Sequence, residues 1–148
     1  MTVWTRGFRP KGAAALGLVL ALVLTEACGG SSPSTPAAPS TPKDTFTGTV
    51  TVKGATFHPF NVAQRGQVDV TLTTLTVAGQ SSTIEMGLGL GVPDGAKCNL
   101  TSATSTTTPA GPAPQLSGTA DSGTLCVQVY DMGNQTTPVV YTVSVVHP

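Results

Sequence analysis

The sequence is poor in charged and aromatic residues. Only 9% of its 148 residues are charged and only 5% are aromatic, and the formal net charge is +0. Arg6, Arg9 and Lys11 lie near the N-terminus, so the remainder is slightly acidic and has no basic cluster. Proteins that bind nucleic acids neutralise phosphates with Lys and Arg. The composition therefore argues against a nucleic-acid partner.

Residues that carry catalysis are also scarce. There are two histidines, His58 within an expected strand and His147 next to the C-terminus. Nucleophilic hydrolysis needs a nucleophile, a base and an orienting group, and no Gly-x-Ser-x-Gly motif is present. We expect both histidines to be surface or edge residues and the protein not to be an enzyme. A minimal hydrolase that uses His58 is retained as an alternative.

Metal-binding patterns are equally sparse. Zinc sites use four Cys, His or carboxylate ligands, and the sequence has no closely spaced pair of them. His58, Cys126, Met132 and His147 are the residue types of a blue-copper site, but His147 lies far downstream of Cys126. Asp94, Asp121 and Asp131 fall in expected turns, where aspartates usually accept hydrogen bonds from backbone amides. We expect no metal and no cofactor.

The first residues match a targeting signal. Basic residues precede an apolar run from Ala13 to Leu24, and the small-residue junction Thr25-Glu26-Ala27 follows. The run is roughly a dozen residues long, whereas a membrane-spanning helix needs about 20. Residues 1–27 are therefore predicted to be an export signal peptide.

Cys28 follows this junction directly, and a Gly/Ser/Pro-rich stretch then continues to Pro42. This arrangement resembles a bacterial lipoprotein signal, in which the cysteine becomes the lipid-modified N-terminus. The family pattern has Leu three residues before the cysteine and a small residue two before it, where this chain has Thr25 and Glu26. The alternative is ordinary cleavage after Ala27, which gives a soluble secreted protein. Prolines favour extended geometry, so residues 28–44 are expected to be a tether.

The number of cysteines bears on the same question. The chain has three, and an odd cysteine in an exported protein needs an explanation. If Cys28 carries lipid, Cys98 and Cys126 remain as a pair in an oxidising compartment, where disulfides persist. We predict that Cys98 and Cys126 form a structural disulfide.

The rest of the chain has the pattern of an all-β domain. Between Phe57 and Val92, apolar residues fall at every second position, as expected for strands with one buried face. The alternation changes phase near Thr73-Thr74, which predicts a bulge, and Pro59 favours an edge or strand-entry position. About eight short antiparallel strands predict a jelly-roll-like β-sandwich over residues 45–148.

Two further segments have a distinct composition. Ile84–Val92 alternates apolar residues with Glu85, Gly87, Gly89 and Gly91, and such a glycine face predicts close packing against other groups. Ser102–Pro114 is rich in Thr, Ser, Pro, Ala and Gly and is expected to be an exposed, mobile loop.

Several motifs resemble one known family. Phe-x-x-Phe-x-Val, a Gly turn, Val-x-Val-x-Leu, Asp-Ser-Gly-x-Leu-x-Val-x-Val and a terminal Tyr-x-Val-x-Val are similar to the bacterial pre-peptidase C-terminal domain. The resemblance covers Thr45 to Val146 and implies a jelly-roll-like accessory module of exported proteins, here without a peptidase domain. Many members carry aspartates on the strand equivalent to Ile84–Leu90. This chain has Glu85 and glycines there, so a calcium site is not carried over.

Together these features predict a non-catalytic module that is anchored by lipid on Cys28 to the extracytoplasmic side of a bacterial cell envelope. The expected role is binding or scaffolding, and the partner is an envelope protein or a glycan. The alternative is a secreted carbohydrate-binding β-sandwich. Sugar rings commonly lie on exposed aromatic faces, but the expected domain has no Trp. Its only aromatic residues are Phe46, Phe57, Phe60, Tyr130 and Tyr141, and most of them fit core positions.

Overall fold

The computed structural model describes residues 41–148. The expected signal peptide (1–27), Cys28 and the tether up to residue 40 lie outside the described residues. The first strand begins at Lys43, slightly before the expected start of the domain at Thr45.

Strands make up all the regular secondary structure of the described residues. They are β1 (Lys43–Val50), β2 (Ala55–Val62), β3 (Gly66–Val77), β4 (Gln80–Ser81), β5 (Met86–Asp94), β6 (Lys97–Thr108), β7 (Leu116–Ala120), β8 (Gly123–Tyr130) and β9 (Val139–Val146). Over residues 41–148 we find no helix with the length and hydrophobicity needed to cross a membrane.

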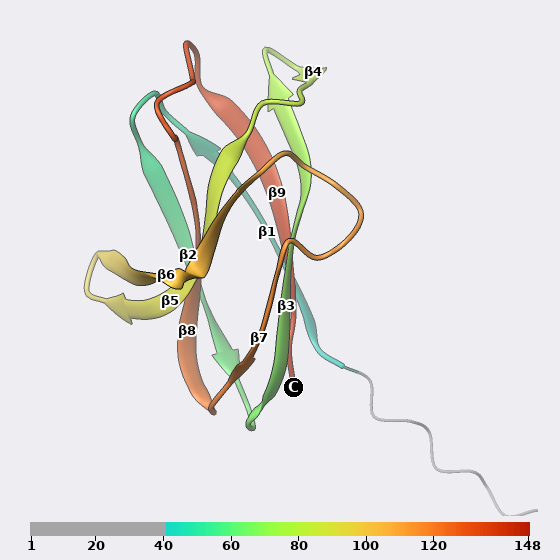
Figure 1. The fold of residues 1–148 in the computed structure, drawn as a ribbon, viewed down its shortest axis with the longest axis vertical. Coiled ribbons are helices and arrows are strands. Elements are labelled where there is room, and N and C mark those ends of the chain that lie inside the picture. Colours follow the sequence, from blue (N-terminus) through green and yellow to red (C-terminus); the bar gives the residue numbers. More distant parts are fainter. Residues whose placement is uncertain (1–40) are drawn as a thin grey trace, which may run out of the picture. The chain divides into compact units, whose positions relative to one another are not determined.

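The strands form two antiparallel sheets that face each other (Figure 1). Sheet A has the order β1-β9-β3, and the other edge of β3 pairs with β7 and with the short β4. Sheet B has the order β2-β8-β5-β6. Without β4, the orders β1-β9-β3-β7 and β2-β8-β5-β6 are those of a jelly roll, whose chain crosses repeatedly between two sheets. The predicted jelly-roll-like β-sandwich is confirmed.

The core lies between the sheets and consists of the alternate side chains that point inward. The buried members are Val50, Phe60, Val62, Val68, Val70, Leu72, Leu75, Met86, Leu88, Val127, Val129, Val139, Tyr141, Val143 and Val145. Apart from the step from Leu72 to Leu75, neighbouring core residues of a strand are two positions apart, because successive side chains of a strand point to opposite faces. The period-two pattern of the sequence therefore identified most of the core.

Two finer predictions are also confirmed. The pairing of β3 with β9 shifts register between Leu72 and Thr74, so that Leu75 returns to the core after the bulge. Pro59 lies on β2, which is an edge strand of sheet B. An edge position suits proline because it has no N–H to donate to a neighbouring strand.

The prediction for Ser102–Pro114 is wrong. Strand β6 continues to Thr108, so half of the expected loop is β-structure, consistent with the strand preference of threonine. The rest is tied to β3, because Gly111 N donates to Leu72 O over 2.9 Å and Leu72 N donates to Gln115 Oε1 over 2.7 Å. The pairing of β3 with β7 ends at Val70, so these backbone groups of Leu72 have no strand partner on that edge, and the loop satisfies them.

Two valines that extend the apolar alternation beyond the buried parts of β1 and β5 are exposed. Val52 is 42% exposed in the turn after β1, and Val92 is 57% exposed near the end of β5. The apolar alternation of this segment starts at Ile84, whereas strand β5 begins at Met86. Val92 is exposed because β5 pairs with β8 only over Gly87–Gly91 and then leaves the sheet with β6.

Candidate functional site

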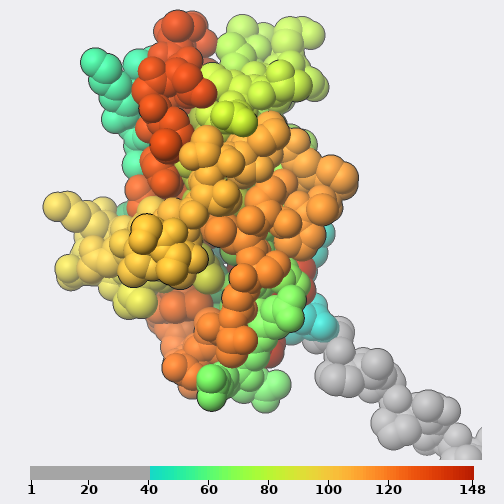
Figure 2. Space-filling view, in the orientation of Figure 1, coloured from blue at the N-terminus to red at the C-terminus, as the bar shows by residue number. Residues whose placement is uncertain are grey.

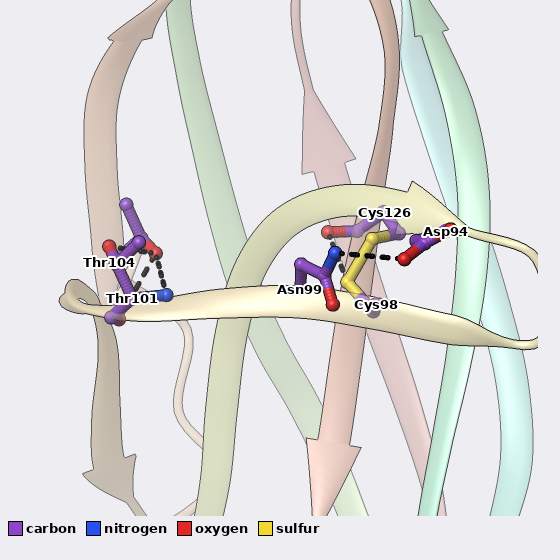
Figure 3. The surroundings of a disulfide bond; sticks show 6 residues. All are labelled: Asp94, Cys98, Asn99, Thr101, Thr104 and Cys126. Carbon is purple, nitrogen blue, oxygen red and sulfur yellow. Dashed lines mark hydrogen bonds between the residues drawn. A yellow bond between two sulfur atoms is a disulfide. The ribbon is translucent and has the colours of Figure 1, made fainter.

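The end of the β5–β6 hairpin crosses the outer face of sheet B. Beyond Gly91, β5 pairs only with β6, through Val92–Asp94 and Lys97–Asn99. Figure 1 shows the yellow ends of β5 and β6 leaving the direction of the other strands, and Figure 2 shows the same yellow segment standing out at the left of the sandwich. Figure 3 shows β6 running across the other strands. In the chain, Cys126 alternates with the core residues Leu125 and Val127, so its side chain points to the outer face.

The predicted disulfide holds this hairpin in place. Cys98 of β6 is bonded to Cys126 of β8, with the two Cα atoms 5.9 Å apart (Figure 3). Cys126 is fully buried although it lies outside the core, because the hairpin covers it. The disulfide prediction is confirmed, and the structure adds that the bond joins the hairpin to the outer face of the sheet.

The glycine face of β5 packs closely, as predicted. A Cβ at Gly87 would overlap the ring of Tyr130, one at Gly89 would overlap the side chain of Leu100, and one at Gly91 would overlap the carbonyl of Asn99. The absent side chains thus allow the ring of Tyr130 and the returning β6 strand to lie directly on the sheet.

An open hollow of about 530 Å³ lies beside this hairpin. It is lined by Leu100, Thr101, Ser102, Ser105, Thr106, Thr107 and Tyr130. We call it the Tyr130 hollow. Its lining is one aromatic ring, one aliphatic side chain and a row of hydroxyl-bearing residues, and none of these described residues is charged.

A bulge in β6 gives the Tyr130 hollow its rim. Gly89 pairs with Ser105 whereas Gly91 pairs with Leu100, so the residues from Thr101 to Thr104 stand out of the ladder. Internal hydrogen bonds close the bulge. Thr101 N donates to Thr104 Oγ1 over 3.2 Å, and Ser105 Oγ donates to Thr101 O over 2.9 Å. Figure 3 shows Thr101 and Thr104 well separated from the disulfide along β6.

A second hollow of about 250 Å³ borders the hairpin tip. It is lined by Ala55, Phe57, Ala96, Lys97, Cys98, Asn99 and Gln128. Gln128 and Tyr130 are both on the outer face of β8, so the two hollows belong to one face of the sandwich.

His58 has a structural environment. It lies on β2, its Nε2 is 2.7 Å from Tyr141 Oη, and its ring stacks on Phe46 with the centroids 4.8 Å apart. Burial lowers the pKa of His58, and burial raises the pKa of Tyr141 to about 12. The cluster fills the side of the sandwich where the edge strands β1 and β2 meet. The interpretation of His58 as an edge residue is confirmed.

His147 is occupied in a different way. Its side chain is 6% exposed, and its Nε2 lies 3.1 Å from Asp44 Oδ2 at the start of β1. The ring centroid is 5.2 Å from that of Phe60, and the backbone N donates to Pro42 O over 3.1 Å. His147 is thus a buried residue rather than the surface residue we expected. It ties the C-terminus to the point where the chain enters the domain.

The three turn aspartates do not assemble into one site. Asp131 accepts hydrogen bonds from the backbone N of Lys53, Gly133, Asn134 and Gln135. These bonds outweigh desolvation, which acts in the opposite direction, and lower the pKa of Asp131. Asp121 pairs with Arg65 at 3.3 Å, and Asp94 accepts a hydrogen bond from Asn99.

No group of three or more potential metal ligands occurs within residues 41–148. The blue-copper residue set is dispersed as well. Cys126 is in the disulfide, whereas His58 and His147 each contact their own partners.

Comparison with known proteins gives no assignment. The chain matches no protein-family model, and it matches no curated protein. The resemblance to the pre-peptidase C-terminal domain therefore stays a prediction that rests on the quoted motifs.

Sequence reasoning missed the Tyr130 hollow. Phe57 and Tyr130 were counted among aromatic residues of which most fit the core, but both lie on the outer face of sheet B. The signal was present in the alternation. Val127 and Val129 of β8 face the core, so the next residue of the strand, Tyr130, points to the outer face.

Proposed function

We propose that this protein is a non-catalytic module of a bacterial cell envelope, held to the membrane by lipid on Cys28, that binds its partner through the outer face of sheet B. The anchor rests on the sequence pattern around Cys28. The disulfide between Cys98 and Cys126 supports an exported location, because such bonds persist in oxidising compartments.

The observation that carries the binding role is the hairpin pinned across sheet B. It produces two hollows on one face of the sandwich, and a disulfide anchors it between them. A surface fixed in this way loses little conformational entropy when a partner binds. The accessory module implied by the family resemblance fits the same role.

The hydrolase alternative needs His58 as a base. In the described residues the ring of His58 is stacked on Phe46 and bonded to Tyr141, which are the contacts of a residue that fills an edge of the core. Cleavage after Ala27 without lipid remains the alternative for the anchor, and it would leave the same binding face on a secreted protein.

Photo-crosslinking in intact cells tests the proposal. A photoreactive residue at Ser102, on the rim of the Tyr130 hollow, should crosslink to an envelope component. The matched control is the same residue at Thr47, an exposed position on the outer face of sheet A, which should give no such product.

Cys28→Ser tests the anchor. It should move the protein to the soluble fraction and remove its lipid label. Crosslinking from Thr47 alone, or membrane retention of Cys28→Ser, would contradict the proposal.

A further inference from the structure

We infer that the Tyr130 hollow binds a ring of an uncharged saccharide. This inference rests on the proposed function, since it names the ligand of the same face. The ring of Tyr130 occupies the space that a Cβ at Gly87 would take, so it lies against the sheet and leaves part of its surface to the hollow. A pyranose presents a patch of C–H groups to such a ring, which combines apolar contact with weak C–H interactions.

The rest of the lining suits the hydroxyl groups of a sugar. Ser102 and Thr107 are exposed on β6, and Ser105 and Thr107 alternate along the strand on the same face as Gly87 and Gly89. Each hydroxyl can donate one hydrogen bond and accept others. A ligand that carries many hydroxyls can exchange hydrogen bonds with this row while its apolar face covers Tyr130.

The charge of the lining selects against other ligands. None of the described residues around the Tyr130 hollow could neutralise a phosphate, a sulfate or a carboxylate, because none is charged. Lys97 borders the second hollow instead, at the tip of the hairpin. Burying an ionic group here would cost its hydration without a compensating partner. The chemistry therefore points to a neutral glycan.

The hollow is also held in shape before a ligand arrives. Leu100 lies over Gly89, the bulge is closed by the hydrogen bonds of Thr101, Thr104 and Ser105, and the disulfide fixes β6 at Cys98. A preformed but open site buries only part of a ligand. We expect a dissociation constant of about 0.1–1 mM for one oligosaccharide. Several copies of the protein on a membrane should bind a polymer more tightly than this.

The test uses the full mature chain in a detergent that has no sugar headgroup. The probes are an array of neutral hexasaccharides of glucose, mannose, galactose and N-acetylglucosamine, with hyaluronan as a charged comparison. Titration calorimetry should detect binding of at least one neutral hexasaccharide and none of hyaluronan. Tyr130→Ala should weaken that binding at least about tenfold, whereas Thr47→Ala on sheet A should not change it.

A second variant guards against misfolding. Thr107→Val keeps the shape of an exposed strand residue and replaces the hydroxyl with a methyl group, and it should weaken binding about threefold or more. Failure of every neutral hexasaccharide to bind would overturn the inference, and so would unchanged binding in both Tyr130→Ala and Thr107→Val. If Ser102 crosslinks to an envelope protein while no saccharide binds, the proposed function stands and the saccharide inference fails. If a saccharide binds through Tyr130 in a chain that gives no crosslink in cells, the saccharide inference stands and the proposed function fails.

Discussion

Tyr141 and His58 show how single residues close the side of this sandwich. Tyr141 is fully buried on β9, and its hydroxyl reaches the ring of His58 on β2, in the other sheet. A small residue is needed beside it, because a Cβ at Gly48 would overlap the Tyr141 ring and hydroxyl. Aromatic, imidazole and hydroxyl groups thus bridge two edge strands without any charge.

The His58 site predicts a pH dependence of stability. Burial lowers the pKa of His58 below its ordinary value of 6.5, so the unfolded chain takes up a proton more readily than the folded one. The stability that the neutral ring contributes is present above pH 6.5 and is lost as the pH falls from there through the folded pKa. The free energy of unfolding should therefore decrease on acidification from about pH 7 to about pH 5.

The matched variant is His58→Gln, which does not titrate and can still bond to Tyr141. Urea unfolding of both proteins across this pH range gives their free energies of unfolding. That of the wild-type protein should fall relative to that of His58→Gln as the pH is lowered. Tyr141 stays neutral throughout, because its pKa is raised to about 12. A difference that does not vary with pH would contradict the assignment.

At the level of elements, the periodic strands could be predicted and the hairpin could not. The alternation in β3 gave its buried face and its bulge, because a core face selects apolar residues at every second position. Strand β6 has no such pattern. Its second half lies at an edge of sheet B and its first half crosses the outer face, so most of its residues never face the core.

The glycine face of β5 permits a prediction at the same scale. Gly87→Ala places a Cβ inside the ring of Tyr130, so the ring must move away from the sheet. We expect a loss of about 1–3 kcal/mol in the free energy of unfolding, as for an overpacked site. The displaced ring should also weaken saccharide binding.

Gly118→Ala on β7 is the matched control, since a Cβ there meets no atom within 4 Å. It should leave stability unchanged or raise it slightly, because alanine reduces the entropy of the unfolded chain. Urea titration of the two variants checks this comparison. Equal effects of the two substitutions would show that Tyr130 adapts without cost.

On the scale of the whole molecule, the sequence predicted the disulfide partners but not the site they support. The number of cysteines and the predicted export signal were enough to predict the pairing of Cys98 with Cys126. The Tyr130 hollow depends on where a crossing hairpin comes to rest on a sheet, which is a tertiary arrangement without a local pattern. Its residues are ordinary threonines and serines in the sequence, and they gain a common role only because β6 bulges beside Tyr130.

The disulfide should then matter for stability and for the site together. It closes a loop with a sequence separation of 28, for which the chain-entropy relation gives about 3–4 kcal/mol at 25 °C. Replacing both cysteines with alanine should lower the free energy of unfolding by about that amount in urea titrations.

The same variant should loosen the hairpin. Because the bond is the covalent link between the hairpin and β8, its loss should raise amide hydrogen exchange from Val92 to Leu100 more than in the core strand β9. Binding at the Tyr130 hollow should weaken in the same variant, since β6 forms its rim. Unchanged exchange in the hairpin would mean that the packing of Leu100 and Asn99 on the glycine face holds it without the disulfide.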